Sequence, residues 1–156
     1  MMSISPMTPV PCTVRGVYVV ENPSGTVPVV VLSDGNGLLL PIFVGIWEAV
    51  SIKSAINKEV LPRPFTHDLF IETLGKFGIR MQSLQIDTVL DGVYYAQLIL
   101  SLGTKEVRVD CRPSDGIALA LRGNAPIYAD ESVLTSAGQQ ENDLPPMTDL
   151  AAFLQK

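Results

Sequence analysis

Residues 79–110, IRMQSLQIDTVLDGVYYAQLILSLGTKEVRVD, carry the strongest local signal for the fold. Asp91-Gly92 separates two apolar runs, and this dipeptide is typical of a two-residue hairpin turn because both positions accept a positive φ. Residues 79–89 and 93–100 are therefore predicted to be paired antiparallel strands. A second turn at residues 102–104 leads into residues 105–110, where valines alternate with charged residues as in a strand.

Shorter strands and helices are predicted on both sides of this stretch. Apolar or β-branched runs predict strands at residues 13–20, 27–32 and 38–44. Pro41 cannot donate a backbone hydrogen bond, so its strand is expected at a sheet edge or at a bulge. The remaining elements are predicted as helices at residues 47–57, 66–77 and 113–122, a strand at 126–129 and a brief helix at 130–134.

This order of elements predicts an α+β fold, with a largely antiparallel or mixed β-sheet and about three main helices packed on it. A chain of 156 residues is long enough for one compact domain and too short for two of ordinary size. We expect a flexible N-terminal segment at residues 1–12, the domain itself at residues 13–136, and a polar C-terminal tail with a short helix at residues 137–156.

Composition and charge limit the classes of function. The net charge is −5 and the isoelectric point is near 4.7, which argues against tight non-specific binding of nucleic acid. The apolar runs are too short to span a bilayer, and the N-terminus lacks the basic region of a signal peptide, so a cytoplasmic protein without membrane contact is expected. Mean hydropathy is +0.30, high for a small monomer, which favours a homo-oligomer, a dimer or larger.

Two segments place an Arg-Pro pair just before a predicted helix, RPFTHD at residues 63–68 and RPSD at residues 112–115. The first turn of a helix exposes unpaired N–H groups, and the planar guanidinium of arginine suits phosphate. The segments are thus candidate phosphate sites, formed by Arg63, Arg112, Thr66 and Ser114. Thr66 is also expected to cap its helix, whose apolar face would comprise Leu69, Phe70, Thr73, Leu74 and Phe77.

The same segments carry the candidate catalytic residues His67, Asp68 and Asp115. A histidine beside a carboxylate can act as a general base, a general acid or a metal ligand. Mg²⁺ or Mn²⁺ prefers oxygen ligands, and the candidate ligands are Asp68, Asp115, Asp110 and Glu48. No organic cofactor is expected, because the sequence contains none of the familiar phosphate-loop, hydrolase or Cys-His motifs.

Structural explanations of these residues stand beside the chemical ones. Carboxylates in a first helical turn stabilise the helix dipole, so Asp68, Asp115 and Glu48 have a structural role available. The arginines could pair with the aspartates and leave neither group for a ligand. Trp47 is expected in the core or in an interface. Cys111 is either a small buried hydrophobe or, beside Arg112, a thiol whose thiolate is favoured.

The chain resembles the bifunctional nuclease (BFN) domain family in five blocks, which occur in consistent order between residues 14 and 134. These blocks are PIFVG at residues 41–45 with Glu48-Ala49, RPFTHDL at 63–69, YYA at 94–96, DCRPSDGIALA at 110–120 and API at 125–127. The second and fourth blocks together are the specific ones. Gly116 stands where many relatives have alanine, and the tail after residue 137 falls outside the resemblance.

The resemblance implies a compact α+β domain that self-associates, and nuclease activity on RNA and DNA as described for some plant members. The matching positions are Glu48, Arg63, Thr66, His67, Asp68, Asp110, Arg112, Ser114 and Asp115. Our leading hypothesis is a nuclease that hydrolyses phosphodiester bonds with help from a divalent metal. The alternatives are a non-catalytic oligomeric module that binds a small anion, a nucleotide or a protein partner, and a purely architectural role for both segments.

Overall fold

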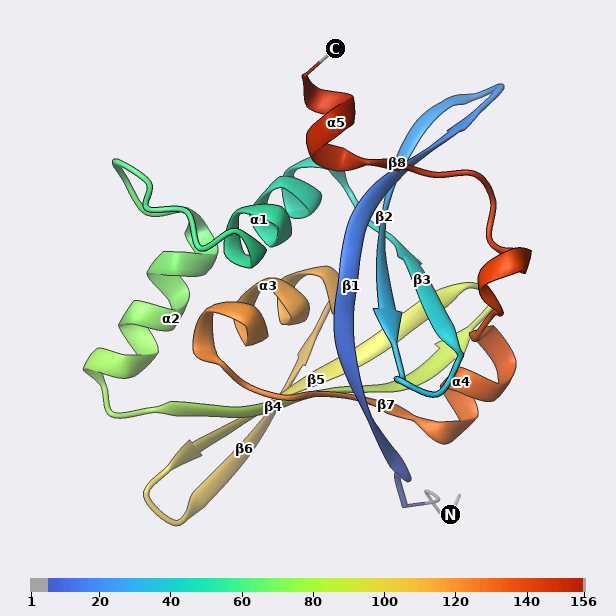
Figure 1. Ribbon diagram of the computed structural model, residues 1–156. Helices are drawn as coiled ribbons and strands as arrows, with labels where there is room; N and C mark the ends of the chain where they lie inside the picture. Colours follow the sequence, from blue (N-terminus) through green and yellow to red (C-terminus); the bar gives the residue numbers. More distant parts are fainter. Residues whose placement is uncertain (1–5, 156) are drawn as a thin grey trace.

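The computed structural model describes residues 6–155 and centres on one mixed β-sheet (Figure 1). The strand order is β3-β2-β1-β7-β4-β5-β6, with β8 paired to β1. All neighbouring pairs are antiparallel except β4 and β7, which are parallel. The strands are β1 (Pro9–Asn22), β2 (Gly25–Ser33), β3 (Leu39–Phe43), β4 (Arg80–Leu90), β5 (Val93–Leu102), β6 (Lys105–Cys111), β7 (Ile127–Asp130) and β8 (Thr148–Asp149).

Three helices form a layer beside the sheet, and α3 is the innermost of them (Figure 1). Helix α3 packs on β4 and β5, α1 packs on α3 and on β1 and β2, and α2 packs chiefly on α3. The helices are α1 (Ile46–Ile56), α2 (Thr66–Lys76), α3 (Pro113–Gly123), α4 (Glu131–Ala137) and α5 (Leu150–Leu154), with a 3₁₀ turn at Glu141–Asp143. No helix of the described residues is long and apolar enough to cross a membrane.

The expected α+β class and the hairpin signal are confirmed. Asp91 and Gly92 have φ angles of 51° and 78°, as a two-residue turn between β4 and β5 requires. Pro41 lies in β3, which is an edge strand of the sheet. A side chain at Gly116 would collide with buried Leu84, so glycine there lets α3 approach β4 closely.

Near both ends of residues 6–155 the chain contacts the rest of the domain. Residues 1–5 of the expected flexible segment lie outside the described residues, but β1 already begins at Pro9 and pairs there with β7. In the tail, β8 pairs with β1, and Leu150 of α5 is fully buried in the main core. Much of the tail therefore packs on the domain.

Helix α2 corrects two expectations. Its N-cap is Phe65, and Thr66 is the first helical residue. The residues that pack toward the core are Ile71 and Leu74, and no residue of this helix is fully buried. Most of the predicted apolar face is turned outward instead, with exposed side chains at Leu69, Phe70 and Phe77.

Candidate functional site

The starts of α1, α2 and α3 share one arrangement, an acidic residue at the third helical position. These residues are Glu48, Asp68 and Asp115. A carboxylate there faces the unpaired N–H groups and the positive end of the helix dipole. Asp68 does so directly, since its Oδ2 accepts a hydrogen bond from the backbone N–H of Phe65 at 2.9 Å. The positions of all three carboxylates thus have a local structural cause.

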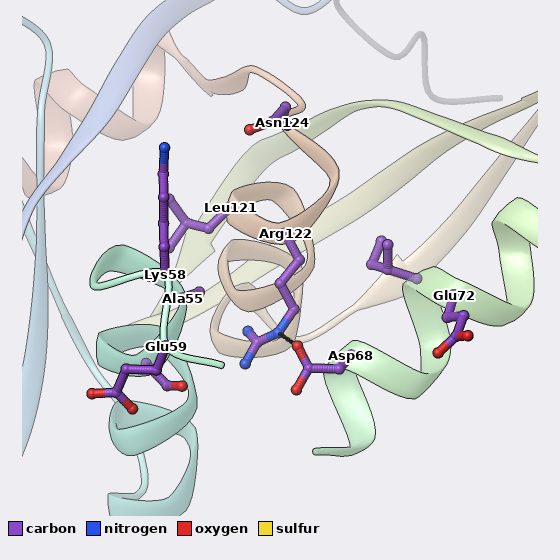
Figure 2. A pocket seen from close by; sticks show the side chains of 10 residues that line it. Ala55, Lys58, Glu59, Asp68, Glu72, Leu121, Arg122 and Asn124 are labelled. Carbon is purple, nitrogen blue, oxygen red and sulfur yellow. Dashed lines mark hydrogen bonds and ion pairs between the residues drawn. The ribbon is translucent and has the colours of Figure 1, made fainter. Parts of the chain in front are cut away.

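Asp68 is also held by a buried arginine. The Nε of Arg122, in the last turn of α3, donates to Asp68 Oδ1 at 2.7 Å (Figure 2). The Arg122 side chain is only 8% exposed, and its other nitrogens donate to the carbonyl oxygens of Ala118 and Ser51. Both oxygens of Asp68 therefore have donors within the protein. The arrangement fits a structural tie between α1, α2 and α3 better than a catalytic or metal-binding role.

The pKa of Asp68 reflects this tie. Burial alone would raise it, but the hydrogen bonds from Arg122 and from the backbone of Phe65 outweigh burial and lower it below the ordinary value. Asp68 thus stays ionised in the folded protein at neutral pH.

His67, the residue before Asp68, lies in an open groove of about 570 Å³. We call it the His67 groove; it is lined by Trp47, Glu48, Val50, Ser51, Pro64, Phe65, Thr66, His67, Arg112 and Asp115. The Nε2 of His67 lies 2.9 Å from Oδ1 of Asp115, and its Nδ1 lies 2.6 Å from Oγ of Ser51. Three helices therefore converge on one imidazole ring.

The partners of His67 define its hydrogen positions. An ionised carboxylate can only accept, so Nε2 carries a hydrogen toward Asp115. In the neutral ring Nδ1 is then an acceptor, and the hydroxyl of Ser51 donates to it. Ser51 is only 4% exposed, so it orients the ring from within the protein. A histidine oriented by a carboxylate is the base-and-orienter pair common to many hydrolytic enzymes.

Arg112 closes the charged side of the groove. Its Nε donates to Asp115 Oδ2 at 2.8 Å, and its Nη2 lies 3.0 Å from Asp115 Oδ1 and 3.1 Å from Glu48 Oε1. Its side chain is nevertheless 64% exposed, and its Nη1 has no acceptor among the described residues. Burial alone would raise the pKa of Asp115, but the hydrogen bonds from Arg112 and His67 outweigh it and lower that pKa.

The structure decides between the two alternatives for Cys111. Burial, followed by the charges of Asp110 and Asp115, raises the pKa of its thiol to about 12. The adjacent Arg112 is turned toward the carboxylates and does not offset these effects. Cys111 is therefore a protonated, poorly nucleophilic thiol at neutral pH, which agrees with the small-hydrophobe alternative and not with the thiolate.

The structure brings some predicted site residues together and separates others. His67, Asp115, Arg112, Glu48 and Thr66 all line the His67 groove. The other four are spread around it: Asp68 in its pair with Arg122, Ser114 buried in a neighbouring pocket, Arg63 exposed on the connector before α2, and Asp110 exposed on β6.

The predicted metal ligands do not form one cluster. Among the described residues, no three histidine, cysteine or carboxylate side chains are placed to hold a metal ion together. Both oxygens of Asp115 and both of Asp68 already accept hydrogen bonds. This arrangement does not fit a resident Mg²⁺ or Mn²⁺.

Sequence reasoning missed Ser51 and Arg122, and of its two alternatives for Trp47 the core is wrong while the interface stays a prediction. Helical spacing offers a signal for two of them, because Ser51 follows Glu48 by one turn and Arg122 follows Asp115 by two turns on the same face. Trp47 is 79% exposed and lies at the wall of the His67 groove, outside the core. Its exposure depends on how α1 docks, which no local pattern encodes.

Comparison with known proteins gives one family. Residues 30–142 match the sequence profile of the bifunctional nuclease domain. An uncharacterized protein of Mycobacterium tuberculosis is 38% identical over 120 residues, which cover 76% of this chain and 71% of that protein. In Arabidopsis thaliana, bifunctional nuclease 2 and bifunctional nuclease 1 are each 32% identical over 72% of this chain. The match spans only 35% and 36% of the two plant proteins, about a third of their length.

Proposed function

The chain belongs to the bifunctional nuclease domain family, and from this premise we propose that it hydrolyses phosphodiester bonds of RNA or DNA at the His67 groove. The observation that carries the proposal is the pair of His67 and Asp115, 2.9 Å apart in a solvent-open groove beside an exposed arginine. Phosphodiester hydrolysis needs a base for the attacking water and positive charge for the phosphate. His67 and Arg112 supply these two functions.

The proposed roles follow from the hydrogen bonds. Nδ1 of His67 takes a proton from the attacking water once the hydroxyl of Ser51 turns away from it. Asp115 keeps the hydrogen on Nε2 and stabilises the imidazolium that forms. The water oxygen bonds to phosphorus, the bond to the leaving oxygen breaks, and the proton passes from His67 to that oxygen. Arg112 binds the phosphate through Nη1. Thr66, which lines the groove, and Arg63, on the connector before α2, are further proposed contacts.

The charge of the groove sets a condition on this mechanism. With His67 neutral, Glu48, Asp115 and Arg112 sum to a charge of −1, which does not attract a polyanion. We therefore propose that nucleic acid binds weakly in this groove. Metal assistance stays a proposal, and no step above depends on it.

The second candidate function is a non-catalytic module that binds a small anion, a nucleotide or a protein. One observation favours it: in the structure both ring nitrogens of His67 already have protein partners. In a module of this kind the network would fix the helices, and the groove would bind without turnover.

The test is a cleavage assay on single-stranded RNA and DNA with purified wild type, His67→Ala and Lys105→Ala. Lys105 is an exposed residue at the start of β6, so its variant controls for loss of a general surface property. We expect cleavage by the wild type and by Lys105→Ala, and a loss of about a hundredfold or more in His67→Ala. Equal rates in all three preparations would show a contaminating nuclease, and binding without cleavage would favour the module.

We also propose that the protein is a homo-oligomer in which the outer face of α2 contacts a second copy. Leu69 and Phe70 are exposed on this helix, and Phe77, which follows its last residue, is 74% exposed. Three large exposed apolar side chains in one short segment are more than a monomer usually leaves in water. Sedimentation of the wild type and of Leu69→Glu would test this, with a smaller species expected for the variant. The cytoplasmic location expected from the sequence stays a prediction.

A further inference from the structure

A second hollow lies on the other side of Arg112 from the His67 groove. It encloses about 430 Å³ between the end of β3, the turn joining β4 to β5, and the start of α3. We call it the Ser114 pocket; it is lined by residues 42–45, 92–94 and 112–114. Arg112 lines both hollows, so it forms the ridge between them.

Ser114 is the feature of this pocket that the fold does not explain. The residue is 7% exposed, and its hydroxyl has no hydrogen-bond partner among residues 6–155. Among the same residues, every side-chain oxygen or nitrogen that solvent cannot reach has a hydrogen-bond partner. Because the Ser114 hydroxyl has no partner, it must be accessible from the pocket that it lines. A nearly buried hydroxyl without a partner has hydrogen-bonding capacity left for a ligand.

The start of α3 adds backbone donors at the same place. Pro113 has no N–H, and the first helical hydrogen bond runs from the amide of Gly116 to the carbonyl oxygen of Arg112. The amides of Ser114 and Asp115 precede that bond, and the N-cap residue Arg112 makes no capping hydrogen bond with its side chain. These amides are at the positive end of an eleven-residue helix, where an anion is stabilised.

Charge distinguishes the two hollows. Among the described residues, Arg112 is the only charged one that lines the Ser114 pocket, whereas two carboxylates line the His67 groove. An anion is therefore favoured more strongly in the Ser114 pocket than in the groove. The remaining wall is apolar and aromatic, with Phe43 60% exposed and Val93 55% exposed, and with Tyr94 beside them. An anion that carries a flat apolar group matches this lining.

We propose that the Ser114 pocket binds the phosphate of a nucleotide, with the base against Phe43, Val93 and Tyr94. The phosphate accepts hydrogen bonds from the hydroxyl and amide of Ser114, the amide of Asp115 and Nη1 of Arg112. As a subsite for the substrate strand this rests on the proposed nuclease function, because the pocket would hold one phosphate while the neighbouring one meets His67. Binding of a free nucleotide does not depend on the nuclease function, because it is inferred from the geometry of the pocket alone.

The test is binding of adenosine monophosphate, inorganic phosphate, adenosine and a short oligoadenylate to the full chain, followed by calorimetry and by backbone amide signals in NMR. We expect the monophosphate and the oligonucleotide to shift the amides of Ser114 and Asp115, and adenosine to bind far more weakly. Ser114→Ala should weaken the phosphate ligands about tenfold or more, since a hydrogen bond to a charged group is lost. Monophosphate binding would identify a mononucleotide as ligand, and oligonucleotide binding alone would identify a strand.

Val93→Asp is the second variant, because Val93 is half exposed at the pocket mouth and a carboxylate there should repel phosphate without touching His67. Unchanged affinity in folded Ser114→Ala and Val93→Asp, or amide shifts centred on His67 and Trp47, would overturn the proposal. Binding at Ser114 without cleavage would refute the nuclease function and leave the subsite intact. Cleavage with unchanged KM and kcat in Ser114→Ala would refute the subsite alone.

Discussion

His67 Nε2 and Asp115 Oδ1 lie 2.9 Å apart although the two residues are 48 positions apart in the sequence and start different helices. The contact exists because α1 and α2 both pack on α3, which brings the first turns of three helices to one place. The same packing gives Asp115 a second partner in Arg112 and gives His67 a second partner in Ser51. One carboxylate thus joins the histidine to the arginine that lines the groove.

Replacing Asp115 by asparagine should remove the acceptor for the Nε2 hydrogen while keeping the shape of the side chain. The ring of His67 then loses its fixed hydrogen position and the charge that stabilises an imidazolium. We expect cleavage to fall by about a hundredfold or more, with melting temperature changed much less. Glu48→Gln is the matched control, since it removes a carboxylate that contacts Arg112 but not His67. Equal losses in both variants would contradict a specific role for Asp115.

Removing the Arg122 guanidinium should destabilise the fold. Arg122→Met leaves Asp68 without its main donor, and breaking a buried ion pair costs roughly 3–5 kcal/mol. Because Asp68 is about a third exposed, we expect the free energy of unfolding, measured with urea, to fall by about 2–3 kcal/mol. Lys53→Met is the control, since Lys53 and Asp149 form a more exposed pair at 3.5 Å, and pairs of that kind contribute about 1 kcal/mol or less. Adding Asp68→Leu to Arg122→Met should recover part of the loss.

Acid should destabilise the folded protein by protonating Asp68 and Asp115. The pKa of Asp68 is lowered in the folded protein, and so is that of Asp115. Their contribution to the free energy of unfolding is therefore complete above the unfolded value of about 3.9, and it is lost as the pH falls through the folded pKa. We expect stability to be flat near neutrality and to drop below about pH 4. In Asp115→Asn this drop should be smaller, and a drop of unchanged size would contradict the assignment.

Cys111 should be almost inert toward alkylation. A thiol with a pKa of about 12 carries little thiolate at neutral pH, and only the thiolate reacts. Iodoacetamide should modify Cys111 roughly a thousandfold more slowly than an ordinary thiol, whose pKa is about 8.5. The unfolded chain should react at the ordinary rate. Cys111→Ser should retain cleavage, and loss of cleavage in a folded Cys111→Ser variant would assign the thiol a role in catalysis.

Local signals account for most of the fold. The turn at Asp91-Gly92, the proline in β3 and the N-cap at Asp130 each follow from backbone preferences of a few neighbouring residues. The direction in which a helix turns its apolar residues did not follow, because it depends on what the helix packs against. Helix α2 contacts chiefly α3, so Ile71 and Leu74 suffice for its docking.

The sequence predicted which residues form the candidate site, but it did not predict which of them contact one another. The two Arg-Pro segments contain His67, Asp115 and Arg112, and these three do meet. Asp68 lies beside His67 in the sequence but pairs with Arg122, 54 positions away. Successive residues in a helix point about 100° apart, so neighbours in one segment face different partners. Which partner each one meets is decided by tertiary packing.

A divalent metal should bind the free protein only after Arg112 is removed. In the wild type both oxygens of Asp115 accept hydrogen bonds from Arg112 or His67, and Glu48 contacts the same guanidinium. Arg112→Gln removes this charge and leaves two carboxylates beside an imidazole, which are ligands that Mn²⁺ accepts. We expect paramagnetic broadening of the Asp115 amide by Mn²⁺ in Arg112→Gln and not in the wild type, with Arg122→Met as a control that leaves the groove charged. Broadening in the wild type at equal Mn²⁺ concentration would show that the ion displaces Arg112 unaided, and metal assistance would then belong in the mechanism.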